Sequence, residues 1–284
     1  MKKWKFILLS FLICFFIFPI TVRADMGPKD LLTVYVKNPP AEEYYLDLLT
    51  NEITTRYEPN YITDPQIITL LYHYESKGWL PALTNGGTGG PMHGSLTGKP
   101  GKNRMIHKFS YVGVPQTYRI IIVTKSGKIH VTDAYTRKAL QSSVTYDYAT
   151  GKTTPAPLVS AYLAQFSLTF ILTLLIEGVI LLKFNINFKK NRKTFLSVNF
   201  ITQLLLTLTV GLTLVKAGPL GAFFMQILME FMILALEILA YRFTLIGVSN
   251  ACKIKYAVAA NLASWFAGFF LLQLCFELTA KILG

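Results

Sequence analysis

The sequence predicts an α+β exported domain followed by an all-α four-helix transmembrane bundle. Three features indicate this fold class: an apolar N-terminal segment, a mixed region over residues 25–157, and a series of long apolar stretches over residues 158–284. Hydrophobic residues make up 52% of the 284 positions, and they are concentrated in runs long enough to cross the hydrocarbon core of a bilayer. We therefore expect an integral membrane protein.

Residues 1–24 have the pattern of a secretory signal peptide. A lysine-rich start precedes an apolar core, and Val22 and Ala24 have the small-residue spacing of a cleavage site. We expect cleavage after Ala24. Because Arg23 lies beside the cut, an uncleaved signal anchor remains the alternative.

The composition of residues 25–157 argues against a nucleic-acid-binding protein and against a disulfide-stabilised domain. The whole chain has a net charge of +13, but this region holds 14 basic and 11 acidic residues, which leaves no basic patch for nucleic acid. The region also contains no cysteine, so it must fold without disulfides. The absence of cysteine fits the exported domain of a bacterial envelope protein better than a eukaryotic secretory route.

Strand and helix patterns alternate within residues 25–157. Asp64 is an N-cap candidate before a proline, and Gly78 is a helix stop signal. The Ser126–Gly127 pair between two β-rich runs predicts a hairpin. The expected elements are a strand at 31–38, a helix at 40–53, a helix at 64–78, a hairpin at 116–135 and a strand at 142–151.

Residues 85–103 are rich in glycine and raise the question of a phosphate-binding loop. The spacing of the P-loop fails, because His93 stands where its first glycine belongs and Pro100 replaces the Ser/Thr. We expect a flexible exported loop instead. Residues 153–157, which contain two prolines, are expected to form a short stiff linker to the membrane.

Four apolar stretches after the linker predict four transmembrane spans, at about 158–182, 194–215, 220–241 and 256–280. The loops after the first and third spans carry five and three basic residues, whereas the loop after the second carries one. By the positive-inside rule the first and third loops are cytoplasmic. The exported domain and the C-terminus then lie outside the cytoplasmic membrane, in agreement with the signal peptide.

Strongly polar residues interrupt the predicted spans and form a candidate intramembrane polar cluster. Its members are Glu177, Asn199, Gln203, Gln226, Glu230, Glu237, Asn261 and Ser264. Each span contributes one of them at a depth of roughly 6–8 Å from the cytoplasmic boundary. Three interpretations stay open: hydrogen bonds that hold the helices together, a proton or cation site, and a docking surface for a partner subunit.

The two carboxylates of the third span lie at different depths in the predicted membrane. Glu230 and Glu237 are seven residues apart, so they share one helix face. Glu237 is close enough to the cytoplasm to reach the headgroups. Glu230 lies about 15 Å from either surface, so it is either protonated and hydrogen-bonded, for example to Gln203 across the bundle, or it has a function.

No catalytic or metal-binding arrangement is found. All four histidines precede residue 158, and residues 158–284 contain no aspartate, which removes the ligands and acids that intramembrane metalloproteases and aspartyl proteases need. The histidines are expected to be ordinary surface or strand residues. We therefore expect neither a metal nor a cofactor, and an enzyme acting on lipid or envelope polymer ranks third among the hypotheses.

Four segments together resemble an uncharacterised family of membrane proteins from Gram-positive bacteria. These segments are "ADMGPK" at 24–29, "VPQTYRIIIVT" at 114–124, "NFITQ" at 199–203 and "EFMILALEILAYR" at 230–242. The resemblance covers most of the chain in order, although Asp30 stands where relatives have a proline. It implies the same architecture, with paired intramembrane glutamates, and implies no activity.

Two functions follow from this organisation. The first is a non-enzymatic integral cytoplasmic-membrane protein whose extracellular domain binds or senses a ligand, either alone or as a subunit of a larger membrane complex. The alternative is an ion- or proton-coupled transporter or channel component that uses Glu230 and Glu237. The expected partners are the lipid bilayer and either a partner membrane subunit or a second copy of the chain, with no nucleic acid.

Overall fold

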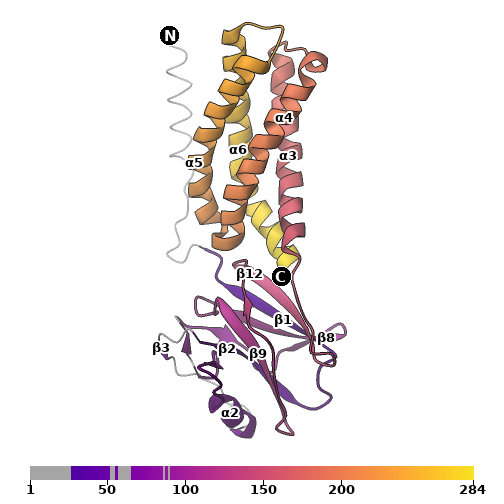
Figure 1. The fold of residues 1–284 in the computed structure, drawn as a ribbon, viewed down its shortest axis with the longest axis vertical. Helices are drawn as coiled ribbons and strands as arrows, with labels where there is room; N and C mark the ends of the chain where they lie inside the picture. The colour runs from indigo at the N-terminus through magenta and orange to yellow at the C-terminus, as the bar shows by residue number, and fades with distance from the viewer. Residues whose placement is uncertain (1–26, 52–54, 57–64, 86, 89) are drawn as a thin grey trace.

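The computed structural model describes residues 27–51, 55–56, 65–85, 87–88 and 90–284. The predicted signal peptide and the predicted N-cap Asp64 lie outside these residues. The described chain has two parts, a strand-rich region and a helical bundle stacked end to end (Figure 1).

The first sheet of the strand-rich region is built around β1, Leu31–Lys37, which lies between β12, Gln141–Asp147, and β8, Arg104–Ser110. β1 is parallel to β12 and antiparallel to β8. The remaining strands lie at its edges: β13 at Thr153–Pro155, β6 at His93–Gly94 and β7 at Lys99–Gly101.

The second sheet is built around the antiparallel pair of β9, Thr117–Thr124, and β2, Tyr44–Thr50. Its other strands are β10 at Ile129–Val131, β11 at Tyr135–Thr136 and β4 at Leu80–Pro81. β3, Thr55–Arg56, pairs with β5, Gly87–Thr88, as a separate two-stranded sheet. The predicted hairpin is confirmed, because β10 is antiparallel to β9.

The two larger sheets and helix α2, Pro65–Tyr72, share one hydrophobic core. Val34 of β1, Ile121 of β9 and Leu71 of α2 are all fully buried in it. Burial of this apolar surface is the main force that holds the region together, since the described residues contain no disulfide.

The helix expected at 40–53 is wrong, because residues 44–50 form strand β2. Every residue of β2 is buried, so the segment shows no alternation of apolar and polar residues that would identify a half-buried strand. Its one charged residue, Asp47, accepts hydrogen bonds from the backbone N–H groups of Leu48, Leu83 and Thr84 and from the Thr84 hydroxyl.

Two predicted loops also contain strands. The glycine-rich segment includes β6 and β7, both of which pair with β8, and the expected linker at 153–157 begins with β13, which pairs with β12. Helix α2 ends at Tyr72 rather than at the glycine stop. β8 itself was not predicted. It places His107 inward and fully buried, whereas His73, His93 and His130 are exposed, as expected of surface residues.

Three helical segments of the described chain are long and apolar enough to cross a membrane: Leu158–Lys183, Phe188–Thr244 and Asn250–Leu283. The first is α3 and the last is α6. The spans expected at 194–215 and 220–241 are not separate helices here, since both lie in the 57-residue middle segment. This segment consists of α4 at Phe188–Leu206, the π-helix η1 at Thr207–Gly211 and α5 at Leu212–Thr244.

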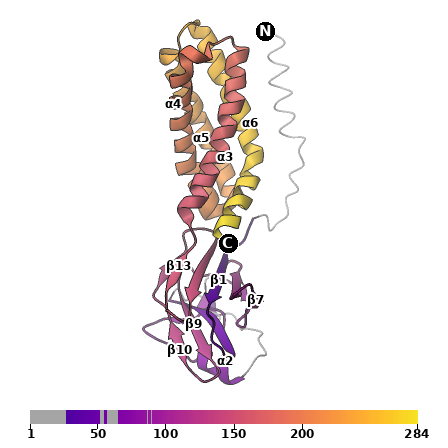
Figure 2. The ribbon, with the colours of Figure 1, turned by 90° about the vertical axis from the view of Figure 1, so that its right-hand side faces the viewer.

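The middle segment folds back on itself at Gly218, which has φ 76° and ψ −174° and precedes Pro219. A positive φ is a conformation that glycine adopts without steric cost, and proline cannot continue the preceding helix. Asn199 of α4 hydrogen-bonds Tyr241 of α5, which requires the two arms to run alongside each other (Figure 2).

The strand-rich region contacts the end of the bundle at several points. The Leu140 amide donates a hydrogen bond of 2.8 Å to the Val215 carbonyl, and the Tyr35 hydroxyl donates to the Gly284 carbonyl. Arg137 is buried next to Leu140. It donates a hydrogen bond to the Leu140 carbonyl and forms an ion pair with Asp30 at 2.7 Å. The junction is therefore built from specific contacts rather than from a loose linker.

Candidate intramembrane polar site

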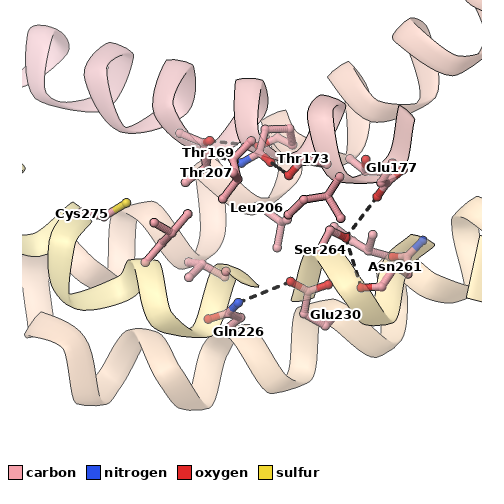
Figure 3. A pocket seen from close by; sticks show the side chains of 18 of the residues that line it. Thr169, Thr173, Glu177, Leu206, Thr207, Gln226, Glu230, Asn261, Ser264 and Cys275 are labelled. Atoms are coloured by element: carbon pink, nitrogen blue, oxygen red, sulfur yellow. Dashed lines mark hydrogen bonds between the residues drawn. The ribbon is translucent and has the colours of Figure 1, made fainter. Parts of the chain in front are cut away.

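A cavity of about 70 Å³ lies between the helices of the bundle (Figure 3). Its volume is enough for a small number of water molecules. Seven of the eight residues of the predicted polar cluster line it: Glu177, Gln203, Gln226, Glu230, Glu237, Asn261 and Ser264. The eighth, Asn199, lies outside the lining.

Glu237 is the most extensively bonded of the three carboxylates. It is buried, and its Oε1 accepts a hydrogen bond of 2.9 Å from the Thr202 hydroxyl of α4. Its Oε2 accepts one of 2.6 Å from Nδ2 of Asn261 on α6. Both oxygens act as acceptors, which is the arrangement that suits an ionised carboxylate.

Glu177 comes from α3 and is also buried. Its Oε1 accepts a hydrogen bond of 3.1 Å from the Ser264 hydroxyl of α6 (Figure 3). Its Oε2 is buried and makes no hydrogen bond to any described residue. One acceptor of this carboxylate is thus available to a proton or a water molecule in the cavity.

Glu230 has the weakest connection to the protein. Its Oε1 is 3.5 Å from Nε2 of Gln226, one turn earlier on α5. The predicted bond across the bundle to Gln203 is wrong: Gln203 instead donates to the Thr169 hydroxyl at 2.8 Å and accepts from the Thr173 hydroxyl at 3.4 Å. Glu230 therefore faces the cavity with little support from other helices.

Asn199 lies beside the cavity and makes its hydrogen bonds there. Its Nδ2 donates to the Phe195 carbonyl at 3.0 Å and to the Tyr241 hydroxyl at 2.9 Å, so both amide hydrogens are used. The Tyr241 and Tyr256 rings lie 5.2 Å apart between α5 and α6. Both tyrosines belong to a buried hydrophobic cluster of the bundle, which lies next to Asn199.

Gln165 is a cavity residue that the sequence analysis missed. It is buried on α3, and its amide packs against Gly211 in the π-helix, where a Cβ would lie only 2.9 Å from Nε2. A glutamine in an apolar helix could have been noticed in the sequence, whereas the π-helix that admits it could not. Oε1 of Gln165 and Oε1 of Gln226 make no hydrogen bond among the described residues.

The cavity lining contains three carboxylates and no lysine, arginine or histidine. Carboxylates in a site shielded from water are costly unless their charge is compensated. In the part of the chain that the structure describes, no three His, Cys, Asp or Glu side chains are grouped closely enough to hold a metal ion. The buried oxygens that make no hydrogen bond to a described residue can accept hydrogen bonds from water, and the carboxylate among them can also take up a proton.

No protein-family model, curated protein or solved structure matches this sequence. The resemblance to a family of Gram-positive membrane proteins thus stays a prediction.

Proposed function

We propose that this chain is a proton-coupled membrane protein, a transporter or channel component in which Glu177, Glu230 and Glu237 bind and exchange protons within the bundle. One observation carries the proposal: three carboxylates from two helices line one internal cavity, without a basic side chain in its lining. Structural hydrogen bonding alone is served by neutral amides and hydroxyls, which are less costly in a membrane.

The proposal includes four membrane crossings. Gly218 reverses the middle segment, and its two arms are joined by the bond from Thr202 to Glu237. Each arm has the length of a predicted span, and the turn between them carries few charges, in contrast to the basic loops at 183–193 and 242–255. The positive-inside rule then supports a strand-rich region outside the cytoplasmic membrane.

Proton flux into proteoliposomes tests the proposal directly. The purified full-length protein is reconstituted with a pH-sensitive dye inside, and a potassium gradient with valinomycin supplies the driving potential. Glu230→Gln and Glu237→Gln keep side-chain volume and remove the titratable proton, so we expect each to reduce flux toward that of protein-free liposomes. Glu177→Gln is expected to act in the same direction.

Glu277→Gln is the matched control, because Glu277 lies on α6 but is exposed and bonded to Gln273. It should leave flux unchanged. Wild-type protein that conducts no more than empty liposomes, or three glutamine variants that all conduct like the wild type, would overturn the proposal.

A second candidate is that the strand-rich region binds or senses an extracellular ligand and passes the signal to the bundle or to a partner subunit. The bond from Leu140 to Val215 favours it, because the region contacts the helical segment that contributes Thr202, Glu230 and Glu237 to the cavity. Crosslinking in native membranes tests for the partner. Recovery of uncrosslinked monomer alone would count against this candidate.

A further inference from the structure

A second cavity, of about 570 Å³, lies between the strand-rich region and the bundle. We infer that it binds the anionic phosphate headgroup of a membrane phospholipid. This junction cavity shares no lining residue with the polar cavity, and a lipid bound there plays no part in proton transport.

The two walls of the junction cavity differ in chemistry. Residues of the strand-rich region that line it are mostly polar or charged: Asp30, Gln116, Thr136, Arg137 and Lys138. The bundle contributes apolar and aromatic surface from Leu158, Tyr162 and Leu212, together with Lys216. A ligand that fits both walls has an anionic head and an apolar body.

The positive charge in the cavity comes from two lysines. Arg137 is already satisfied, since it pairs with Asp30 and donates to the carbonyls of Val114 and Pro115. Lys138 and Lys216 are exposed, and no ion pair joins either of them to another described residue. One lysine comes from each part of the protein, so a phosphate between them would join the two parts.

The position of the cavity also favours a lipid. Lys216 lines this cavity and lies two residues before the Gly218 turn, which packs against Pro28 and Leu140 of the strand-rich region. For a membrane-embedded bundle this is the level of the headgroups, where each lysine near an anionic surface adds to lipid binding. Val159 and Leu163, which flank the cavity residues of α3, are 71% and 60% exposed and offer apolar surface for acyl chains.

The volume of the cavity agrees with this occupant. Pockets that hold small organic ligands measure about 300–1,000 Å³. The junction cavity falls within that range and is larger than a bare phosphate ion needs. A glycerophosphate headgroup, with its chains leaving along α3, is the chemistry that accounts for both the size and the mixed lining.

The test compares lipids on the purified full-length protein in a neutral detergent. Phosphatidylglycerol, phosphatidylcholine and inorganic phosphate are titrated separately, and bound lipid is counted by native mass spectrometry alongside the midpoint of thermal unfolding. We expect retention of phosphatidylglycerol and a rise in the midpoint with that lipid. The double variant Lys138→Gln/Lys216→Gln should bind it about tenfold to thirtyfold more weakly.

Lys128→Gln/Lys152→Gln is the control, because both lysines are exposed in the strand-rich region and neither lines the junction cavity. It should bind phosphatidylglycerol like the wild type. Equal retention of phosphatidylcholine, the same response to inorganic phosphate alone, or unchanged binding in the Lys138/Lys216 variant would each overturn the inference. The circular dichroism spectrum and the thermal unfolding midpoint of the lipid-free variant, compared with those of the wild type, show that the variant has folded.

Discussion

Asn261 donates a hydrogen bond of 2.6 Å to Oε2 of Glu237, and this bond joins α6 to α5 inside the polar cavity. Thr202 donates to the other carboxylate oxygen from α4. Glu237 is thus held by two neighbouring segments of the bundle at once.

Glu237→Gln should destabilise the bundle, because the new amide has only one acceptor oxygen for the two donors, Asn261 and Thr202, that the carboxylate accepts from. We expect a loss of about 1 kcal/mol in the free energy of unfolding, the usual size of an interhelical hydrogen bond in a membrane protein. Unfolding in mixed micelles, followed by circular dichroism, measures it. The double variant Glu237→Gln/Asn261→Asp restores a donor–acceptor pair and should recover part of the loss; a double variant less stable than the single one would contradict this account.

His107 makes the strand-rich region sensitive to acid. Burial lowers the pKa of its imidazole from the ordinary value of 6.5 to about 4. Below pH 6.5 the unfolded state binds a proton that the folded state does not, so stability falls as the pH falls from about 6.5 to about 4. The loss amounts to about 3 kcal/mol over that range.

Fluorescence of Trp79, which packs against the core of the strand-rich region, reports this unfolding in a Trp4→Phe/Trp265→Phe background. The acid-dependent loss should shrink in His107→Gln and persist in His130→Gln, because His130 is exposed. An unchanged pH profile in His107→Gln would show that another group is responsible.

Asp47 should be among the least replaceable residues of the strand-rich region. Each of its two carboxylate oxygens accepts two hydrogen bonds, and all four donors are buried with it. In Asp47→Asn an N–H₂ group replaces one oxygen and faces two of these donors. We expect a loss of about 2–3 kcal/mol from the unsatisfied groups, measured by denaturant unfolding. Asp133→Asn, at an exposed position, should change stability little.

Gly218 combines a positive φ with close packing. A Cβ at this position would lie 3.0 Å from Cγ of Pro28 and 3.2 Å from Cδ2 of Leu140. Gly218→Ala should therefore cost more than about 1 kcal/mol, from backbone strain and from displacement of the junction. Gly247→Ala is the control, because it also has a positive φ but has open space around it. Equal losses in the two variants would show that packing at the junction contributes nothing.

The sequence predicted some elements well and others poorly, for physical reasons. The hairpin of β9 and β10 has a turn whose glycine requires a special conformation, and such turn chemistry is local. β2 was mistaken for a helix because it is buried on both faces and so lacks the period of a half-buried strand. β8 was missed because one of its inward positions is His107, a residue that usually lies at the surface.

The candidate site was also predictable from the sequence only in part. Polar residues in apolar helices are visible in any sequence, and seven of the eight line one cavity. Their pairing was not accessible, because it depends on how the packed helices are rotated against one another. Gln203 thus bonds to α3 rather than to Glu230.

The bond from the Leu140 amide to the Val215 carbonyl bears on how the protein folds. Val215 lies in the last turn before Gly218, where helix carbonyls lose their intrahelical partners. The strand-rich region therefore supplies a C-terminal cap to a helix of the bundle. A cap provided by another region makes the two regions thermodynamically interdependent, so they should melt together in one cooperative transition rather than as separate modules.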